Sequence, residues 1–186
     1  MLVAKIRKAK LSDAKELSEL AERIFRTAFS DQNSKENMRL HCESSYGEKI
    51  QSDEIANPNL LTLVAEVNGK LAAYVQLRWK HHLACLTGHR PGEILRFYVE
   101  QAWHGKGLAH KLMEACLKEF YKRNNDSAWL GVWENNPRGI SFYKKFNFKE
   151  VGEQKFPVGK DIQRDVIMER PMALSCIRTN NKGEIE

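Results

Sequence analysis

Cysteine is scarce in this sequence, and its spacing disfavours zinc-binding proteins and secreted disulfide scaffolds. Only four of the 186 residues are cysteines, and no two of them form a C-x-x-C pair: Cys42, Cys85, Cys116 and Cys176. No set of cysteines and histidines has the spacing of a zinc site, and a short secreted disulfide scaffold would need more cysteines. We therefore predict reduced thiols in a cytoplasmic protein with no bound metal.

Long hydrophobic runs are absent as well. No apolar stretch approaches the ~20 residues that cross a bilayer, and the basic N-terminus MLVAKIRKAKLSD lacks the apolar core of a signal peptide. A hydrophobic content of 42% and a charged content of 29% are typical of a soluble globular protein. The length suits one core. We expect a single domain over residues 1–172, a polar C-terminal tail over residues 173–186, and no association with membranes.

One segment, from Phe97 to Leu112, has the pattern of an anion-binding loop. An aromatic and β-branched run ends in polar residues, and a short loop with Gly105 and Gly107 then leads into a helical segment. The first N–H groups of a helix have no intrahelical acceptor, and glycine allows close approach of a phosphate. The pattern predicts a diphosphate site at residues 104–109: His104, Gly105, Lys106, Gly107, Leu108 and Ala109. A simple tight turn is the alternative, because neither a Walker A loop nor G-x-G-x-x-G is present.

A second segment follows that helix and reads WLGVWENNPRGISFYKKFNF, residues 129–148. The two segments together resemble motifs A and B of the GNAT superfamily of N-acetyltransferases. Motif A is matched by His104, Gly107 and Ala109, with Trp103 before them; motif B is matched by Asn136, Gly139, Tyr143, Asn147 and Phe148. Within the superfamily the chain is most similar to the PaiA-like polyamine acetyltransferases. The segments that it shares with them are WLGVWE, FYKK, TAF, QNSKENM and E-I-x-R-x-Y. The resemblance covers roughly residues 3–172.

Three residues depart from the family pattern. His104 replaces Arg or Gln, and a histidine can still donate to a phosphate. Gly139 replaces Ala inside the last helix, at a cost of about 1 kcal/mol in helix propensity. Asn147 replaces the glycine that ends this helix, and asparagine is the next-best residue for the left-handed conformation of that position.

The resemblance implies a mixed α/β fold: a twisted, mostly antiparallel sheet of about seven strands, splayed between the fourth and fifth, with helices on both faces. Periodicity and turn residues independently place the elements. Strands are expected at residues 3–7, 60–67, 71–79, 93–99, 128–133, 151–156 and 164–168. Helices are expected at residues 12–29, 34–41, 47–55 and 106–122, and from residue 137 onward. Residues 81–92 read as a polar loop.

The resemblance also implies acetyl-CoA as cosubstrate, with its pantetheine arm in the gap between the splayed strands. Besides the loop residues, the expected contacts to it are Phe97, Tyr98, Val99, Asn136, Tyr143 and Lys145. Backbone groups of Tyr98 and Val99 would bind the pantetheine amides. Asn136 binds the arm or simply caps the helix at Pro137, and both roles are compatible.

Tyr143 is the predicted general acid, because a phenol with an ordinary pKa of about 10 is protonated at neutral pH. A core aromatic with a satisfied hydroxyl is the alternative. Glu93 is the candidate base, with Glu100 as the second carboxylate in reach of the strand end and a solvated surface charge as the alternative.

The formal net charge of +6 raises the possibility of nucleic-acid binding. No long basic run with interleaved aromatics supports it, so we expect no nucleic-acid partner. The basic residues of the two motifs suit the phosphates of coenzyme A instead: Lys106, Lys111, Arg138, Lys144 and Lys145.

The resulting prediction is an acetyl-CoA-dependent N-acetyltransferase that acts by direct transfer in a ternary complex. The acceptor is a primary amine, and the subgroup resemblance indicates spermidine or spermine. The second and third helices would wall the acceptor pocket with carboxylates: Glu36, Glu43, Glu48, Asp53 and Glu54. Acetylation of a protein, a peptide or another small amine is the runner-up, and a non-catalytic CoA-binding regulator is the alternative from another class. A homodimer is possible.

Overall fold

The computed structural model describes residues 4–172, so the predicted tail at 173–186 lies outside the described residues. Seven strands are present: β1 (Ala4–Lys8), β2 (Leu60–Val67), β3 (Lys70–Arg78), β4 (Pro91–Val99), β5 (Ser127–Trp133), β6 (Lys149–Val158) and β7 (Asp161–Pro171). Five α-helices accompany them: α1 (Ala14–Phe29), α2 (Lys35–Ser45), α3 (Glu48–Ala56), α4 (Leu108–Lys122) and α5 (Pro137–Lys145). Short 3₁₀ turns lie at η1 (Leu11–Asp13), η2 (Ser30–Gln32) and η3 (Gln101–Trp103).

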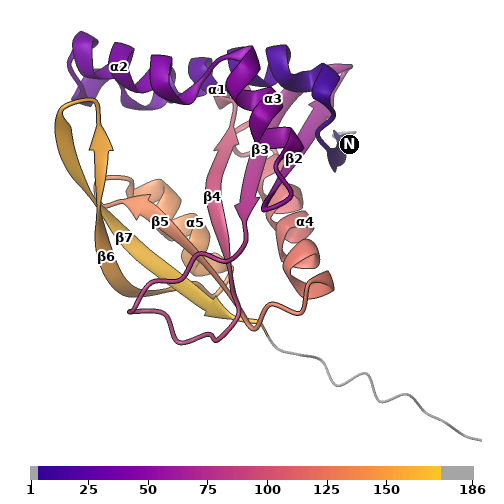
Figure 1. Cartoon of the computed structure of the whole chain (residues 1–186), viewed down its shortest axis with the longest axis vertical. Helices are drawn as coiled ribbons and strands as arrows, with labels where there is room; N and C mark the ends of the chain where they lie inside the picture. Colours follow the sequence, from indigo (N-terminus) through magenta and orange to yellow (C-terminus); the bar gives the residue numbers. More distant parts are fainter. Residues whose placement is uncertain (1–3, 173–186) are drawn as a thin grey trace, which may run out of the picture.

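The strands form one sheet in the order β1-β2-β3-β4-β5-β7-β6, as expected for a mixed α/β fold (Figure 1). Every neighbouring pair is antiparallel except β4 and β5, which are parallel and joined through α4. β4 and β5 pair only where Pro91–Ile94 meets Ser127–Leu130. Beyond these residues both strands continue without pairing to each other, to Val99 and Trp133. The predicted splay between the fourth and fifth strands is therefore confirmed.

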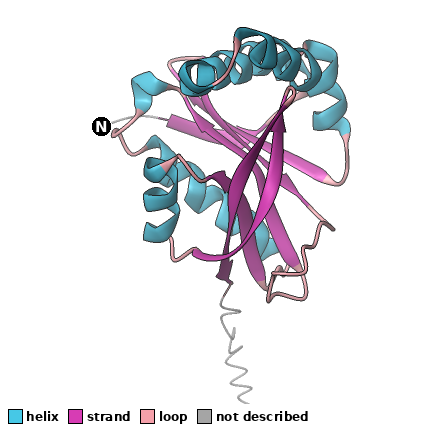
Figure 2. Cartoon of the chain, turned by 90° about the vertical axis from the view of Figure 1, so that its left-hand side faces the viewer, coloured by secondary structure: helices cyan, strands magenta, loops and turns pink. Residues whose placement is uncertain are grey.

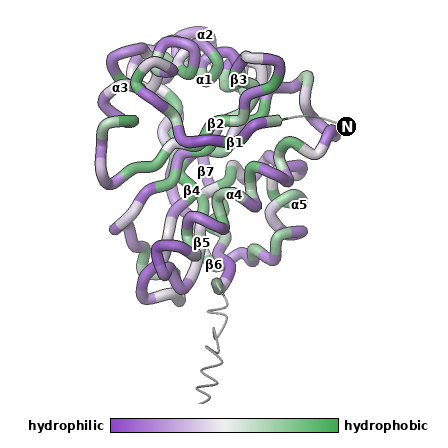
Figure 3. The backbone as a smooth tube through the Cα atoms, turned by 90° about the vertical axis from the view of Figure 1, so that its right-hand side faces the viewer, coloured by the Kyte–Doolittle hydropathy of each residue, from purple (hydrophilic) through white to green (hydrophobic). Residues whose placement is uncertain are grey.

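Helices cover both faces of the sheet, which is also as predicted. Strand alternation separates the two layers in β2: Leu63 and Ala65 belong to the core cluster under α4, whereas Val64 belongs to the cluster under α1. Helices α1, α2 and α3 lie together on one side of the sheet, and α4 and α5 lie together on the other side (Figure 3). The end of β4 thus lies between two helical layers.

A third hydrophobic cluster lies under the segment between β3 and β4. Leu83 and Leu86 of this segment pack on Trp129 of β5 and Ile167 of β7. The Glu169 carboxylate anchors the segment by accepting bonds from Thr87 and Gly88. The segment expected to be a polar loop therefore covers part of the sheet, because its scattered apolar residues find buried partners from distant strands.

The hairpin of β6 and β7 crosses toward the helical layer of α1 and α2 (Figure 2). The amide of Lys160 at its tip donates to Asn37 Oδ1 at 3.1 Å, and Gln163 Nε2 donates to Asn33 Oδ1 at 2.8 Å. Two segments that are more than 120 residues apart in the sequence are thereby joined at the open side of the sheet.

Candidate active site

A cavity of about 640 Å³ lies where the splayed strands open. Its walls come from α1, the end of β4, the first turn of α4 and the start of α5. Seven of the predicted site residues line it: Phe97, Tyr98, Val99, His104, Ala109, Asn136 and Tyr143. The structure therefore brings both sequence motifs to one cavity.

The glycine loop has the conformation that an anion site requires. Gly105 and Gly107 have φ of +73° and +81°, the region that favours glycine. Gly107 is the N-cap of α4, and no side chain caps this helix. Its first amides, from Leu108 to His110, therefore have no intrahelical acceptor. Among residues 4–172, apart from the two chain neighbours of each glycine, no residue has an atom within 4 Å of a Cβ built on Gly105 or Gly107, so the loop is open to a ligand.

The edge of β4 offers further hydrogen-bonding groups. The Glu100 amide donates to Ala72 O on the β3 side at 2.9 Å, and Val99 lies directly opposite Ala73. In an antiparallel pair this pattern turns the N–H and C=O of Val99 and Phe97 away from β3. They face the gap left by β5, whereas the backbone of Tyr98 faces β3.

His104 connects this edge to α5. Its Nε2 lies 2.8 Å from the Val99 carbonyl, and its Nδ1 lies 2.7 Å from Nη1 of Arg138. Because a carbonyl only accepts and a guanidinium only donates, the ring carries its proton on Nε2 and accepts at Nδ1. The His104 N–H that we expected to donate to a phosphate thus already donates to the Val99 carbonyl. The guanidinium of Arg138 is the cation beside it.

Arg138 is a cavity residue that sequence analysis placed only within a general basic cluster. It lines the cavity from the first turn of α5, two residues after Asn136. The position at a helix start next to a motif residue is the signal that could have singled it out.

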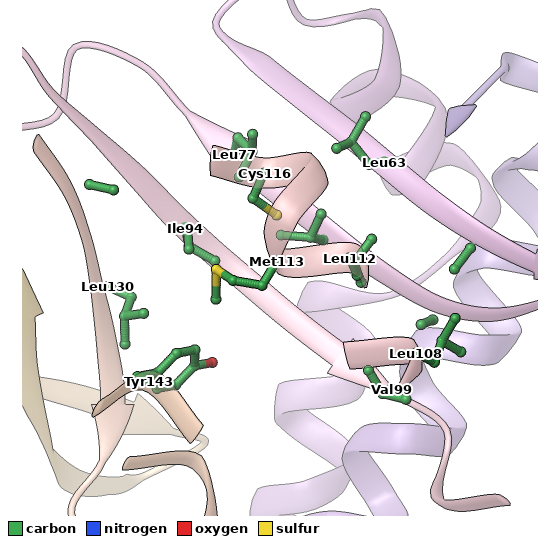
Figure 4. Packing of buried hydrophobic residues seen from close by; sticks show 14 of the residues in the cluster. Leu63, Leu77, Ile94, Val99, Leu108, Leu112, Met113, Cys116, Leu130 and Tyr143 are labelled. Atoms are coloured by element: carbon green, nitrogen blue, oxygen red, sulfur yellow. The ribbon is translucent and has the colours of Figure 1, made fainter. Parts of the chain in front are cut away.

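Tyr143 lies at the inner wall of the cavity and is 9% exposed. Its ring packs edge-on against Phe97 and Phe148, and Figure 4 shows it beside Leu130 with the hydroxyl directed away from β5. Burial raises the pKa of Tyr143 well above that of an ordinary phenol, so the hydroxyl stays protonated at neutral pH. The group is available as a proton donor facing the gap.

Asn136 caps α5, because its Oδ1 accepts from the Gly139 amide at 2.9 Å. A Cβ at position 139 would lie only 2.7 Å from Asn136 Nδ2. Glycine at this position therefore leaves room for the Asn136 side chain, which lines the cavity.

The sequence matches the Acetyltransferase (GNAT) family over residues 15–148. The chain belongs to the GNAT acetyltransferase family. It is a GNAT N-acetyltransferase, and the comparisons with single proteins agree. An N-acetyltransferase of Lactobacillus delbrueckii subsp. lactis is 26% identical over 172 residues, which is 92% of this chain and 99% of the relative.

Two further relatives carry more specific names. The spermine/spermidine N(1)-acetyltransferase of Bacillus subtilis is 34% identical over 64 residues, which is 33% of this chain and 41% of the relative. The crystal structure of PaiA N-acetyltransferase from Thermoplasma acidophilum in complex with coenzyme A has a TM-score of 0.73 and 24% identity. That match covers 91% of this chain and 99% of the PaiA chain, and it shows the shared fold.

The candidate base Glu93 lies at the far end of β4 from the acetyltransferase cavity. Its carboxylate accepts from Arg78 at 2.6 and 2.9 Å and lies 2.8 Å from Nδ1 of His81. It is 4% exposed and does not line the cavity. Val99 lies six positions further along the strand, roughly 20 Å away. Its position therefore argues against a role as base.

Glu100 and Lys145 differ in their relation to the cavity. Glu100 lines it and pairs with Arg23 of α1 at 2.9 Å. Lys145 is exposed near the end of α5 and does not line the cavity. The loop residues from Gly105 to Leu108 do not line it either. Contact of these residues with a diphosphate stays a prediction.

The acidic residues of α2 and α3 do not form the wall that we expected. Each of four pairs with a nearby cation: Glu36 and Glu43 with Arg39, Asp53 with Lys49, and Glu54 with Arg96. The cavity wall on this side comes from α1. The prediction that α2 and α3 line the cavity was wrong. Helical i,i+3 and i,i+4 spacing lets Glu36, Glu43 and Asp53 pair on their own helices, whereas Glu54 pairs with Arg96 of β4.

Two negative findings concern the described part of the chain. Within residues 4–172, no group of three or more His, Cys, Asp or Glu side chains is placed to hold a metal ion. In the same range, no helix combines the length and the apolar character that crossing a bilayer requires.

Proposed function

We propose that this N-acetyltransferase transfers the acetyl group of acetyl-CoA to a primary amine in a ternary complex. The observation that carries the proposal is the convergence of three features on one cavity: the open edge of β4, the uncapped start of α4 and the Tyr143 hydroxyl. Coenzyme A fits these features, because the amides of α4 suit its diphosphate and the β4 edge suits the amides of its pantetheine arm.

In this proposal each group has a separate task. The amides from Leu108 to His110 hold the diphosphate, with Lys106 as a nearby cation. Backbone groups of Phe97 and Val99 bind the pantetheine arm and orient the thioester. The neutral amine nitrogen forms a bond to the thioester carbonyl carbon, the C–S bond breaks, and Tyr143 donates its proton to the departing sulfur. The nitrogen releases one proton to solvent as the amide forms, and solvent returns a proton to Tyr143.

For the acceptor we propose a polyamine such as spermidine or spermine. The similarity to the Bacillus subtilis enzyme supports this class, although it extends over one third of the chain. Glu100 is the one acidic side chain among the described residues that line the cavity, and an ammonium group would share its carboxylate with Arg23. A cytoplasmic location belongs to the same proposal and is supported by the free thiols of Cys42, Cys85 and Cys116.

The test is thiol release from acetyl-CoA by the purified protein with separate acceptors: spermidine, spermine, putrescine, amino acids and short peptides. Acceleration by spermidine or spermine alone is the expected result. Turnover with peptides only would keep acetyl transfer and replace the substrate class. No turnover with any acceptor, together with CoA binding measured by calorimetry, would support the non-catalytic regulator instead.

A further inference from the structure

Arg138 of α5 differs from the other arginine of the cavity in its partner. Among residues 4–172, two arginines line the cavity, Arg23 and Arg138. Arg23 pairs with the Glu100 carboxylate at 2.9 Å. The Arg138 guanidinium has one polar partner in this part of the chain, the His104 ring, which accepts from it as a neutral group. A guanidinium has several N–H donors, so Arg138 keeps its charge and most of its donors for a ligand in the cavity.

The sheet sets the orientation of the His104 ring. Its Nε2–H donates to the Val99 carbonyl at 2.8 Å, and Val99 is held opposite Ala73 by the pairing of β4 with β3. The other ring nitrogen, Nδ1, therefore presents its lone pair to Nη1 of Arg138, at 2.7 Å. A carbonyl oxygen can accept more than one hydrogen bond, so Val99 can bind His104 and still serve the pantetheine arm.

These two hydrogen bonds connect opposite sides of the gap in the sheet. The pairing of β4 with β5 ends at Ile94 and Leu130, so strand pairing does not join the end of β4 to the start of α5. The bonds from Arg138 to His104 and from His104 to Val99 make this connection instead. An arginine side chain that is already held in place loses less rotamer freedom when it binds a ligand, so the connection favours binding through Arg138.

The anion-binding groups of the cavity follow His104 directly in the chain. Ala109, in the first turn of α4, lines the cavity together with Arg138. Lys106, the cation of the loop, lies with Nζ 5.1 Å from the centre of the Trp103 ring and does not line the cavity. Arg138 is therefore the cation that shares the cavity with the start of α4. A phosphate group suits it, because two phosphate oxygens can accept from the planar guanidinium.

We propose that Arg138 binds the diphosphate of acetyl-CoA and that His104 is a positioning residue that directs the Arg138 guanidinium toward it. The inference rests on the proposed use of acetyl-CoA. Arg138 adds a charged contact from α5 to the contacts that the α4 amides make with the diphosphate. His104 acts through Arg138 and not by a contact of its own, because both of its ring nitrogens are already bound.

The first test measures CoA binding by calorimetry for the unchanged protein and for Arg138→Gln, which removes the charge and keeps a polar side chain. The variant should bind CoA about 10- to 100-fold more weakly, as expected for the loss of hydrogen bonds to a charged group. The loss should be equally large with 3′-dephospho-CoA, which keeps the diphosphate. An unchanged affinity for CoA, or a loss that disappears with 3′-dephospho-CoA, would overturn the diphosphate contact.

The second test asks whether His104 acts through Arg138. His104→Leu, which lacks both ring nitrogens, should weaken CoA binding about 10-fold. His104→Gln should bind CoA within about threefold of the unchanged protein, because an amide can donate to Val99 and accept from Arg138. In the Arg138→Gln background, His104→Leu should cost less than about twofold, since the effects of two coupled residues do not add. Equal losses in the two backgrounds would overturn the positioning role.

Arg90→Gln is the matched control. Arg90 is an exposed arginine that directly precedes β4, at the end of the strand opposite the cavity, and it does not line the cavity. This variant changes the net charge of the protein by the same amount as Arg138→Gln, so it should keep the CoA affinity of the unchanged protein. A loss as large as that of Arg138→Gln would indicate a long-range effect of charge and would overturn the direct contact. Thermal unfolding checks that each variant is folded.

This proposal and the proposed acetylation fail in different ways. If Arg138→Gln binds CoA as tightly as an unchanged protein that acetylates an amine of the panel, only the Arg138 contact fails. If the expected losses of CoA affinity occur in a protein that acetylates no amine, the contact is supported and the acetylation fails. If the unchanged protein does not bind CoA, both fail.

Discussion

Tyr143 packs in the core and also lines the cavity. Its ring contacts Phe97, Phe142 and Phe148, so it is part of the core, while its hydroxyl lies at the cavity. The two interpretations that the sequence left open are thus compatible. The burial that raises its pKa keeps the proton on the phenol and also makes it a weaker acid.

We expect Tyr143→Phe to lower kcat by about 100-fold, at the lower end of the range for general acids because burial weakens this one. The affinity for CoA should change less than about twofold, since only the hydroxyl is removed. Steady-state kinetics and calorimetry measure the two quantities. Tyr121→Phe, at an exposed position on α4, is the control. Full activity of Tyr143→Phe would exclude the acid role.

At the scale of elements, the start of α4 and the end of α5 depend on residues with positive φ. Gly107 begins α4, and Asn147 follows α5 with φ of +63°. The Phe148 amide donates to Tyr143 O and the Asn147 amide to Lys144 O, which is the Schellman pattern. The prediction of a left-handed Asn147 is confirmed.

Replacing Gly107 with valine should abolish measurable CoA binding. The new side chain would occupy the open space beside the first amides of α4 and would disfavour φ of +81°. Gly69→Val is the matched control, because Gly69 has φ of +77°, has equally open surroundings and lies in the β2–β3 turn away from the cavity. Both variants should lose similar stability in thermal unfolding. Undiminished CoA affinity in Gly107→Val would contradict the anion-site proposal.

At position 147 the conformation predicts opposite effects of two small residues. Asn147→Ala should lower the free energy of unfolding by about 1 kcal/mol, because alanine is disfavoured at positive φ. Asn147→Gly should be neutral or slightly stabilising. Denaturant unfolding of both variants measures the difference. A variant with alanine as stable as the one with glycine would show that the left-handed conformation is not maintained in solution.

At the scale of the whole molecule, the sheet has a closed end and an open end. Glu93 belongs to the closed end, where β4 and β5 pair and where Arg78 and His81 bind its carboxylate. The cavity belongs to the open end, where the strands diverge. The buried ion pair of Glu93 and the cavity therefore lie at opposite ends of β4.

Glu93→Gln should lower the free energy of unfolding by about 2 kcal/mol, because it removes a buried carboxylate that binds the partly exposed guanidinium of Arg78. The kinetics of the folded fraction should be unchanged, since Glu93 does not line the cavity. Denaturant unfolding and initial rates measure the two effects. A stable variant with a greatly reduced kcat would restore Glu93 as the candidate base.

Local patterns predicted most elements to within a few residues, because helix caps and turn residues act over short distances. The Asn68-Gly69 turn is an example: both residues have positive φ, as a two-residue hairpin requires. β6 is longer than expected by two residues at its end, since we ended it at Phe156 and it continues through Pro157 to Val158. β6 is an edge strand, where the missing N–H of proline costs no sheet hydrogen bond.

The sequence by itself determined the family, the order of the elements and the two motifs that meet at the cavity, because these depend on local spacing and on similarity to known proteins. Only the tertiary structure decided which carboxylates are near the cavity. Glu93 and most of the acids of α2 and α3 are bound to cations away from the cavity, whereas Glu100 lines the cavity. The reason is physical: the burial and the pairing of a charge depend on residues far away in the chain, and the sequence does not state which of them it will meet.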